Sequence, residues 1–179
     1  MLKRVLIIHG WEASSKDNWF LEEKERLEKL GYEVVVPDMP NTLLPKKDEW
    51  VQVIKDSNPD ENSILIGHSL GGTAILRYLE ETSDKIGKCI LVATPIRKLE
   101  NNEFDSSPIY NFFELDIDYQ KIKQNCREFV IINQTNDPFV PLQDGRDLAK
   151  YTNGNLKVLE GNNHLCEIDL NLLEECILK

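Results

Sequence analysis

The sequence has few of the features that mark secreted, membrane-bound or nucleic-acid-binding proteins. Only four apolar residues follow Lys3 and Arg4 before His9, too few for a signal-peptide core, and no apolar run approaches the length of a membrane span. Basic residues are outnumbered, 21 Lys and Arg against 31 Asp and Glu, so the net charge is −10. Such a charge repels phosphate backbones and anionic lipids. We therefore expect a cytoplasmic protein that binds neither nucleic acid nor membranes.

Cysteine and histidine are also scarce, with four and three copies in 179 residues. The cysteines form no CxxC pair, and two of them lie in or beside apolar strand or helix patterns. This distribution is typical of reduced packing residues and not of a disulfide framework. No second thiol or histidine lies at ligand spacing from Cys166, so we expect no metal site.

Short apolar runs rich in Val, Ile and Leu alternate with helix-like segments along the whole chain. The runs are residues 5–8, 34–36, 64–66, 90–92, 129–132 and 156–159. Helical periodicity covers residues 19–30, 50–55, 70–80, 142–151 and 168–178. This alternation is typical of the α/β class and predicts a six-stranded, mainly parallel sheet with helices on both faces. We find no internal repeat or linker, so residues 1–179 are expected to form one domain.

The fourth connection between strands exceeds a strand-helix-strand unit by about 10 to 14 residues. This excess lies in residues 97–125, which are rich in aromatic side chains: Phe104, Tyr110, Phe112, Phe113 and Tyr119. One interpretation is a short lid-like insertion whose aromatics wall a pocket. The alternative is a helix packed by its aromatics against the core.

Residues 67–71 read Gly-His-Ser-Leu-Gly and lie between a buried strand and an apolar-striped helix. This is the G-x-S-x-G nucleophile elbow in its required context, and it makes Ser69 the candidate nucleophile. The turn is so sharp that Ser69 must adopt a strained backbone conformation, which exposes its hydroxyl. A dinucleotide fingerprint would require Gly at position 69, and a P-loop would require Gly-Lys-Ser or Gly-Lys-Thr. Neither pattern is present.

A serine nucleophile needs a base and an acid, which in this architecture follow it in the order Ser, Asp or Glu, His. Asp137 lies five residues past the fifth strand and His164 five residues past the sixth, so both belong to one edge of the sheet. His164 is the only histidine after the elbow. Asp137 can also be interpreted as a turn residue that caps the next helix. The other nearby carboxylates fit the geometry less well: Asp144, Glu160 and Glu167.

The oxyanion that forms during acyl transfer needs two backbone N–H donors. We expect one from Leu70, which follows the nucleophile, and one from Trp11, because Gly10 lets the chain leave the first strand close to the elbow. Both loops open where the strand order is expected to reverse, between the first and third strands. We assign no catalytic role to His9 or His68.

These motifs resemble the α/β-hydrolase superfamily, and within it the small retinoblastoma-binding-protein and YdeN-like serine hydrolases. The similarity spans nearly the whole chain and includes residues 8–11, 36–40, 67–72, 137–141 and 161–164. It implies a three-layer α/β-hydrolase sandwich, a Ser69, Asp137, His164 triad, no cofactor, and esterase-type hydrolysis of small acyl substrates. The L-x-C-x-E segment for retinoblastoma binding is missing, so retinoblastoma binding is not implied, and the sequence identifies no other protein partner.

The sequence therefore predicts a carboxylesterase-like serine hydrolase that cleaves a small ester, thioester or amide through an acyl-enzyme. Two alternatives remain open. The same residues would serve an acyltransferase if an alcohol or amine outcompeted water as acceptor. A non-catalytic interaction module on a hydrolase scaffold is the other, because fold alone does not guarantee chemistry.

Overall fold

The computed structural model, described here for residues 4–99 and 106–178, contains a six-stranded sheet. Its strand order is β2-β1-β3-β4-β5-β6, and every neighbouring pair is parallel. The strands are β1 (Arg4–Ile8), β2 (Glu33–Val35), β3 (Ser63–His68), β4 (Ile86–Val92), β5 (Cys126–Gln134) and β6 (Asn155–Leu159). The chain leaves β1 toward β2 on one side and returns to β3 on the other. The order therefore reverses between β1 and β3, as the sequence predicts.

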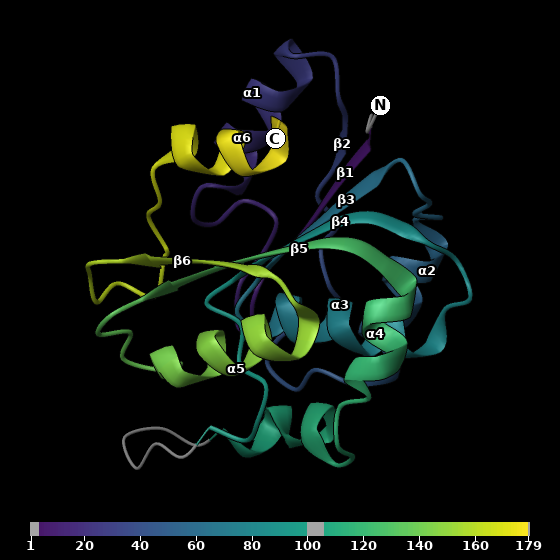
Figure 1. Ribbon diagram of the computed structural model, residues 1–179, viewed down its shortest axis with the longest axis vertical. Helices are drawn as coiled ribbons and strands as arrows, with labels where there is room; N and C mark the ends of the chain where they lie inside the picture. Colours follow the sequence, from purple (N-terminus) through teal and green to yellow (C-terminus); the bar gives the residue numbers. More distant parts are fainter. Residues whose placement is uncertain (1–3, 100–105, 179) are drawn as a thin grey trace.

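Helices cover both faces of the sheet and complete a three-layer sandwich (Figure 1). One face carries α1 (Phe20–Lys29) and α6 (Leu170–Leu178). The other face carries α2 (Lys47–Asp56), α3 (Leu70–Glu81), α4 (Tyr119–Asn125), α5 (Leu142–Thr152) and a 3₁₀-helix, η1 (Ser107–Phe113). The predicted α/β class and six-stranded parallel sheet are thus confirmed.

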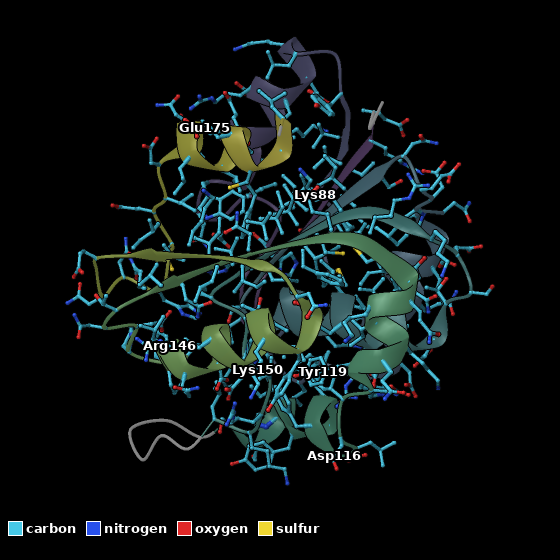
Figure 2. All side chains as sticks on the ribbon, viewed as in Figure 1. Lys88, Asp116, Tyr119, Arg146, Lys150 and Glu175 are labelled. Carbon is cyan, nitrogen blue, oxygen red and sulfur yellow. The ribbon has the colours of Figure 1, made fainter. Side chains whose placement is uncertain are left out.

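Alternation along β1 explains the two apolar layers. Val5 and Ile7 belong to the core beneath α1 and α6, whereas Leu6 and Ile8 belong to the core beneath α2 and α3. Successive side chains of a strand point to opposite faces, so a strand that is apolar throughout supplies both cores. Lys88 is the exception on β4: its ammonium donates to the carbonyl of Cys176 on α6 at 2.9 Å, in the layer between sheet and helix (Figure 2).

The described part of the insertion, residues 97–99 and 106–125, contains η1 and α4, and Phe104 lies outside the described residues. Phe112 is fully buried in the core and contacts Trp50 edge to face, with 5.6 Å between ring centroids. For Phe112, the second interpretation of the insertion, packing against the core, is therefore correct. Phe113 is partly buried and packs at the edge of the same core.

In the described part of the chain, no helix combines the length and the apolar character that crossing a bilayer requires. Three of the cysteines, Cys89, Cys126 and Cys176, are buried, and Cys166 is partly exposed.

Candidate active site at the carboxyl edge of the sheet

Ser69 stands between the end of β3 and the start of α3. Its backbone has a φ of 53° and a ψ of −125°, a conformation that non-glycine residues rarely adopt. Its N–H donates to the carbonyl of Val92 at 2.8 Å, and its carbonyl accepts from Gly72 N at 2.9 Å, which holds the turn in place. A side chain on Gly67 or Gly71 would collide with backbone atoms of Gly72 or Ile8. The glycines of the elbow are therefore required by close packing.

The structure brings the three predicted residues together in one hydrogen-bonded chain. His164 Nε2 lies 2.9 Å from Ser69 Oγ. His164 Nδ1 lies 2.9 and 2.8 Å from the two carboxylate oxygens of Asp137. A proton on Nδ1 that is shared with the carboxylate leaves Nε2 as an acceptor for the serine hydroxyl. The arrangement can therefore remove the Ser69 proton and stabilise the imidazolium that results.

Asp137 is held in its ionised form by its surroundings. Its side chain has no solvent exposure, and burial alone would raise the pKa of the carboxyl. The hydrogen bond and charge of His164, with the backbone N–H groups of Val140 and Phe139, outweigh this burial and bring the pKa of Asp137 below its ordinary value. Both N–H groups donate to Oδ1 at 2.9 Å. Asp137 is thus a turn residue and a partner of His164 as well. It does not cap the next helix, because the N-cap of α5 is Pro141, without a side-chain hydrogen bond.

Ser69 and His164 open into a cleft of about 840 Å³. Trp11 and Leu70, the two residues expected to supply oxyanion donors, both line it. Leu70 is the first residue of α3, where backbone N–H groups point out of the helix without intrahelical acceptors. A helix N-terminus also favours negative charge through its dipole. The site can therefore accommodate an anion that forms on a carbonyl bound next to Ser69.

The insertion contributes to this cleft through residues that the sequence did not single out. Leu99 and Ile109 line the cleft, whereas Phe112 and Phe113 do not. Ile109 precedes Phe112 by three residues on η1, so both share the buried side of this helix. The number of aromatic residues in the insertion did not indicate which of them line the cleft, because Phe112 packs into the core and Phe113 at its edge.

The rings of the two remaining histidines, His9 and His68, both bind main-chain atoms. His9 accepts from Met39 N through Nε2 at 2.9 Å, and its Nδ1 lies 2.9 Å from the Gly10 carbonyl, which requires a neutral ring. Burial lowers the pKa of His9, in agreement with this state. His68 is different, because its Nε2 lies 2.8 Å from the carbonyl oxygen of His164. Nothing in the motif indicates this contact, because the position before the nucleophile is free to vary in G-x-S-x-G.

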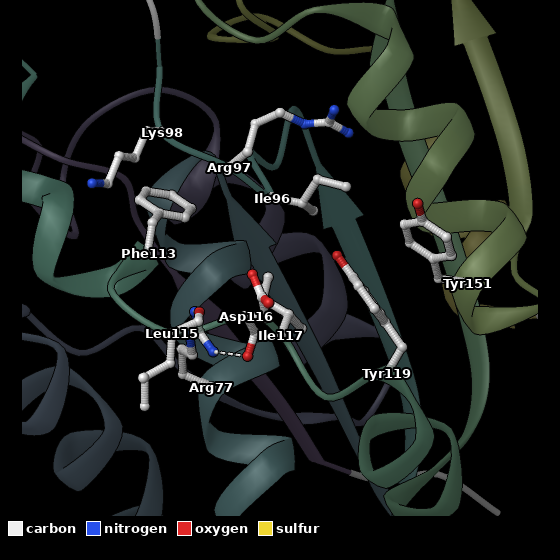
Figure 3. A pocket seen from close by; sticks show the side chains of 10 residues that line it. All are labelled: Arg77, Ile96, Arg97, Lys98, Phe113, Leu115, Asp116, Ile117, Tyr119 and Tyr151. Atoms are coloured by element: carbon white, nitrogen blue, oxygen red, sulfur yellow. Dashed lines mark hydrogen bonds between the residues drawn. The ribbon is translucent and has the colours of Figure 1, made fainter.

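A second hollow, of about 540 Å³, lies between α3, α4 and α5 and is drawn in Figure 3. Its cations already have partners: Arg77 pairs with Glu80 at 2.8 Å, and Arg97 pairs with Asp144 at 2.8 Å. Lys98 lies over the ring of Tyr110. No serine, cysteine or histidine is found among the described residues that line this hollow, so it lacks the parts for acyl transfer. Residues 4–99 and 106–178 also hold no group of three side chains suited to a metal ion.

Comparisons with known proteins place the chain in a family. A family described as serine hydrolase matches residues 5–169. The chain is 32% identical over 171 residues to YdeN of Bacillus subtilis (strain 168), covering 93% of this chain and 88% of that one. It is 28% identical over 143 residues to the serine hydrolase RBBP9 of Rattus norvegicus, covering 79% and 70%.

Solved structures show the same likeness at the level of the fold. The crystal structure of the ydeN gene product from B. subtilis has a TM-score of 0.85 at 28% identity, over 99% of this chain and 100% of that one. Est1E from Butyrivibrio proteoclasticus has a TM-score of 0.74 at 17% identity, over 98% and 85%. At this identity the second likeness concerns the fold alone.

Proposed function

Because the chain belongs to the serine hydrolase family and has an α/β-hydrolase-like fold, we propose that it is a carboxylesterase-like enzyme acting on small acyl substrates. The observation that carries the proposal is the hydrogen-bonded chain from Ser69 Oγ through His164 to Asp137. The substrate is an ester, thioester or amide, and the reaction needs no cofactor.

In this mechanism His164 Nε2 takes the proton of Ser69 as Oγ attacks the acyl carbonyl. The N–H groups of Leu70 and Trp11 stabilise the oxyanion, and Asp137 stabilises the imidazolium. His164 then returns the proton to the leaving group, which departs and leaves an acyl-enzyme on Ser69. A water molecule, activated by the same imidazole, releases the acid and restores the serine.

The lining of the cleft supports a substrate with an apolar acyl part. Leu70, Leu99 and Ile109 supply aliphatic surface, and Trp11 supplies an aromatic ring. The cleft also contains the carboxylates of Glu12 and Asp17, and no Lys or Arg occurs among its described lining residues. This charge disfavours substrates whose leaving group is anionic.

The test is hydrolysis of p-nitrophenyl acetate, butyrate and hexanoate by the wild type and by Ser69→Ala. We expect the substitution to lower kcat by roughly six orders of magnitude, because the three residues act as a unit. Melting temperatures of both proteins, measured in parallel, exclude unfolding as the cause.

Residual activity of Ser69→Ala above about 1% of wild type would place the nucleophile elsewhere, since a lost triad serine leaves far less. A folded wild type that turns over none of the esters would favour the non-catalytic module. Acyl transfer to an added alcohol in preference to water would favour the acyltransferase.

A further inference from the structure

The main chain around His164 is held in an unfavourable conformation. His164 has a φ of 56° and Leu165 a φ of 52°, so two consecutive non-glycine residues lie in the left-handed region. Side chains with a Cβ avoid this region, and single residues adopt it only where their surroundings enforce it. Some feature of the fold must therefore hold this loop.

Three side chains from separate parts of the fold form hydrogen bonds to the main chain of residues 163–165. His68 donates through Nε2–H to the carbonyl of His164 at 2.8 Å, because a carbonyl can only accept. Trp19 donates through Nε1–H to the carbonyl of Leu165 at 3.0 Å. Gln134 Oε1 accepts from Asn163 N at 3.1 Å and from Leu165 N at 3.3 Å.

These three residues come from the segment before α1, the end of β3 and the end of β5, and each is at most 5% exposed. Gln134 also donates through Nε2 to Asn163 Oδ1 at 2.7 Å, so both ends of its amide bind the loop. Buried hydrogen bonds of this kind are costly to break, because the groups left behind find no water. The loop is thus held by side chains from outside it, in addition to its own hydrogen bonds from Leu165 N to Asn163 Oδ1 and from Cys166 N to the Asn163 carbonyl, both at 3.1 Å.

His68 makes a second contact with the base. Its ring lies 5.1 Å from the His164 ring, centroid to centroid. Burial and the neighbouring His164 lower the pKa of His68 to about 4, so the ring is neutral at ordinary pH. Its Nδ1 has no hydrogen-bond partner among the described residues. The Nε2–H bond to the His164 carbonyl is therefore the polar contact that distinguishes this histidine from a phenylalanine.

We propose that Trp19, His68 and Gln134 form a base-loop clamp that positions His164 between Asp137 and Ser69, with His68 as its central positioning residue. The expected change in kcat rests on the proposed function. The clamp itself concerns only the conformation of residues 163–165 and does not depend on that function. Among the described residues, no hydrogen bond joins Trp19, His68 or Gln134 to Ser69 Oγ or to the ring nitrogens of His164. Their effect is exerted through the main chain of residues 163–165.

The test compares three variants with the wild type. His68→Phe keeps the ring and removes the donor, His68→Gln places an amide donor near the position of Nε2, and Phe20→Leu is the matched control. Phe20 packs on His68, with 5.9 Å between ring centroids, and makes no bond to the loop. The measurements are backbone amide hydrogen exchange at residues 163–165 by NMR, kcat and KM for p-nitrophenyl butyrate, and the pH profile of kcat/KM.

For His68→Phe we expect faster exchange at Asn163 and Leu165, a kcat lower by roughly 100-fold with KM little changed, and a shifted pH profile, because small misplacements of a base are costly. His68→Gln should recover most of the exchange protection and kcat. Phe20→Leu should lower the melting temperature and leave the exchange of these two amides and the pH profile unchanged.

Unchanged exchange at both amides in His68→Phe would overturn the clamp. Faster exchange with an unaltered kcat would overturn its positioning role. If the wild type hydrolyses no ester, the proposed function fails, and the exchange data still decide whether the clamp exists.

Discussion

At Asp137, one carboxylate oxygen accepts the backbone N–H groups of Phe139 and Val140, while both oxygens lie within 2.9 Å of His164 Nδ1. The turn orients the carboxylate before His164 binds it. An asparagine at this position keeps the shape but replaces one oxygen with an NH₂ group. If the remaining oxygen keeps its two backbone donors, the NH₂ group faces Nδ1 and favours the wrong imidazole tautomer.

Asp137→Asn should therefore lower kcat by about 10⁴, as the corresponding change does in another serine hydrolase triad, with little change in melting temperature. Glu160→Gln is the matched control, because Glu160 is an exposed carboxylate of the neighbouring loop whose one hydrogen-bond donor among the described residues is Thr135 Oγ1. We expect it to cost less than about tenfold, since it disturbs only a surface hydrogen bond. The reverse ranking of the two variants would identify Glu160 as the acid.

Glu23 on α1 lies outside the active site and is a buried carboxyl with a shifted pKa. Its side chain is fully buried, and neither carboxylate oxygen has a hydrogen-bond partner among the described residues. Burial, followed by the negative charge of Glu174, raises the pKa of Glu23 to about 7. The unfolded chain ionises this group near 4.5, so the folded state is progressively disfavoured as the pH rises from 4.5 to 7.

Glu23→Gln should consequently raise the free energy of unfolding at pH 8, by up to about 3 kcal/mol, and have little effect below pH 4.5. Urea denaturation at the two pH values measures the difference. Glu22→Gln, which removes one charge from the exposed face of the same turn, controls for the change in net charge. An equal effect of Glu23→Gln at both pH values would contradict the assignment.

The sequence could indicate Ser69, Asp137 and His164 because each carries a local signal: a motif, a proline-stiffened turn, and a lone histidine after the last strand. Their roles stay predictions until activity is measured. His68 and Gln134 could not be found this way. Their importance depends on which loop lies opposite them, and residue 164 is 96 positions from His68 along the chain.

Among the elements, η1 shows how the insertion divides its side chains. Ile109 and Phe112 both belong to the buried core, but only Ile109 also lines the cleft. The position on η1, and not the size of the side chain, decides which of the two residues lines the cleft.

Ile109→Ala should thus lower kcat/KM for hexanoate esters more than for acetate esters, by about 1 to 3 kcal/mol of lost apolar contact. Phe112→Leu is the control, and it should lower the melting temperature through the cavity it leaves without changing the ratio between the esters. Equal losses across the ester series for Ile109→Ala would mean that the acyl chain binds elsewhere.

The inner strands β1, β3, β4 and β5 were predictable because a parallel strand buried on both faces is apolar over most of its length. The edge strands β2 and β6 are partly exposed, yet each contains a short run rich in Val or Leu. The lengths of the strands were harder to predict. β5 extends from Cys126 to Gln134, beyond the apolar residues 129–132, because polar residues at its ends still pair with β4 and β6. A helix in the insertion was one of two interpretations, but the bounds of η1 and α4 were not predicted, because short helices in an aromatic, acidic segment show no clear periodicity.

For the molecule as a whole, the net charge of −10 acts together with the carboxylates of Glu12 and Asp17 in the cleft. An acidic surface raises the local concentration of cations and lowers that of anions, and salt screens the effect. A substrate with a cationic leaving group should therefore bind faster than one with an anionic leaving group.

We expect butyrylcholine to give a higher kcat/KM than a butyrate ester with a carboxylate in its leaving group, and the gap to narrow between 20 mM and 500 mM NaCl. A neutral butyrate ester, measured at both salt concentrations, controls for direct effects of salt on the enzyme. A gap that does not respond to salt would show that shape and not charge selects the leaving group.

The central claim is that Ser69 is an activated nucleophile, and covalent labelling tests it most directly. A fluorophosphonate probe should add one phosphonyl group to the wild type, and peptide mass spectrometry should locate it on Ser69. Ser69→Ala should remain unlabelled, and Asp137→Asn should label far more slowly. A wild type that stays unlabelled while fully folded, or an adduct on any other residue, would contradict the account.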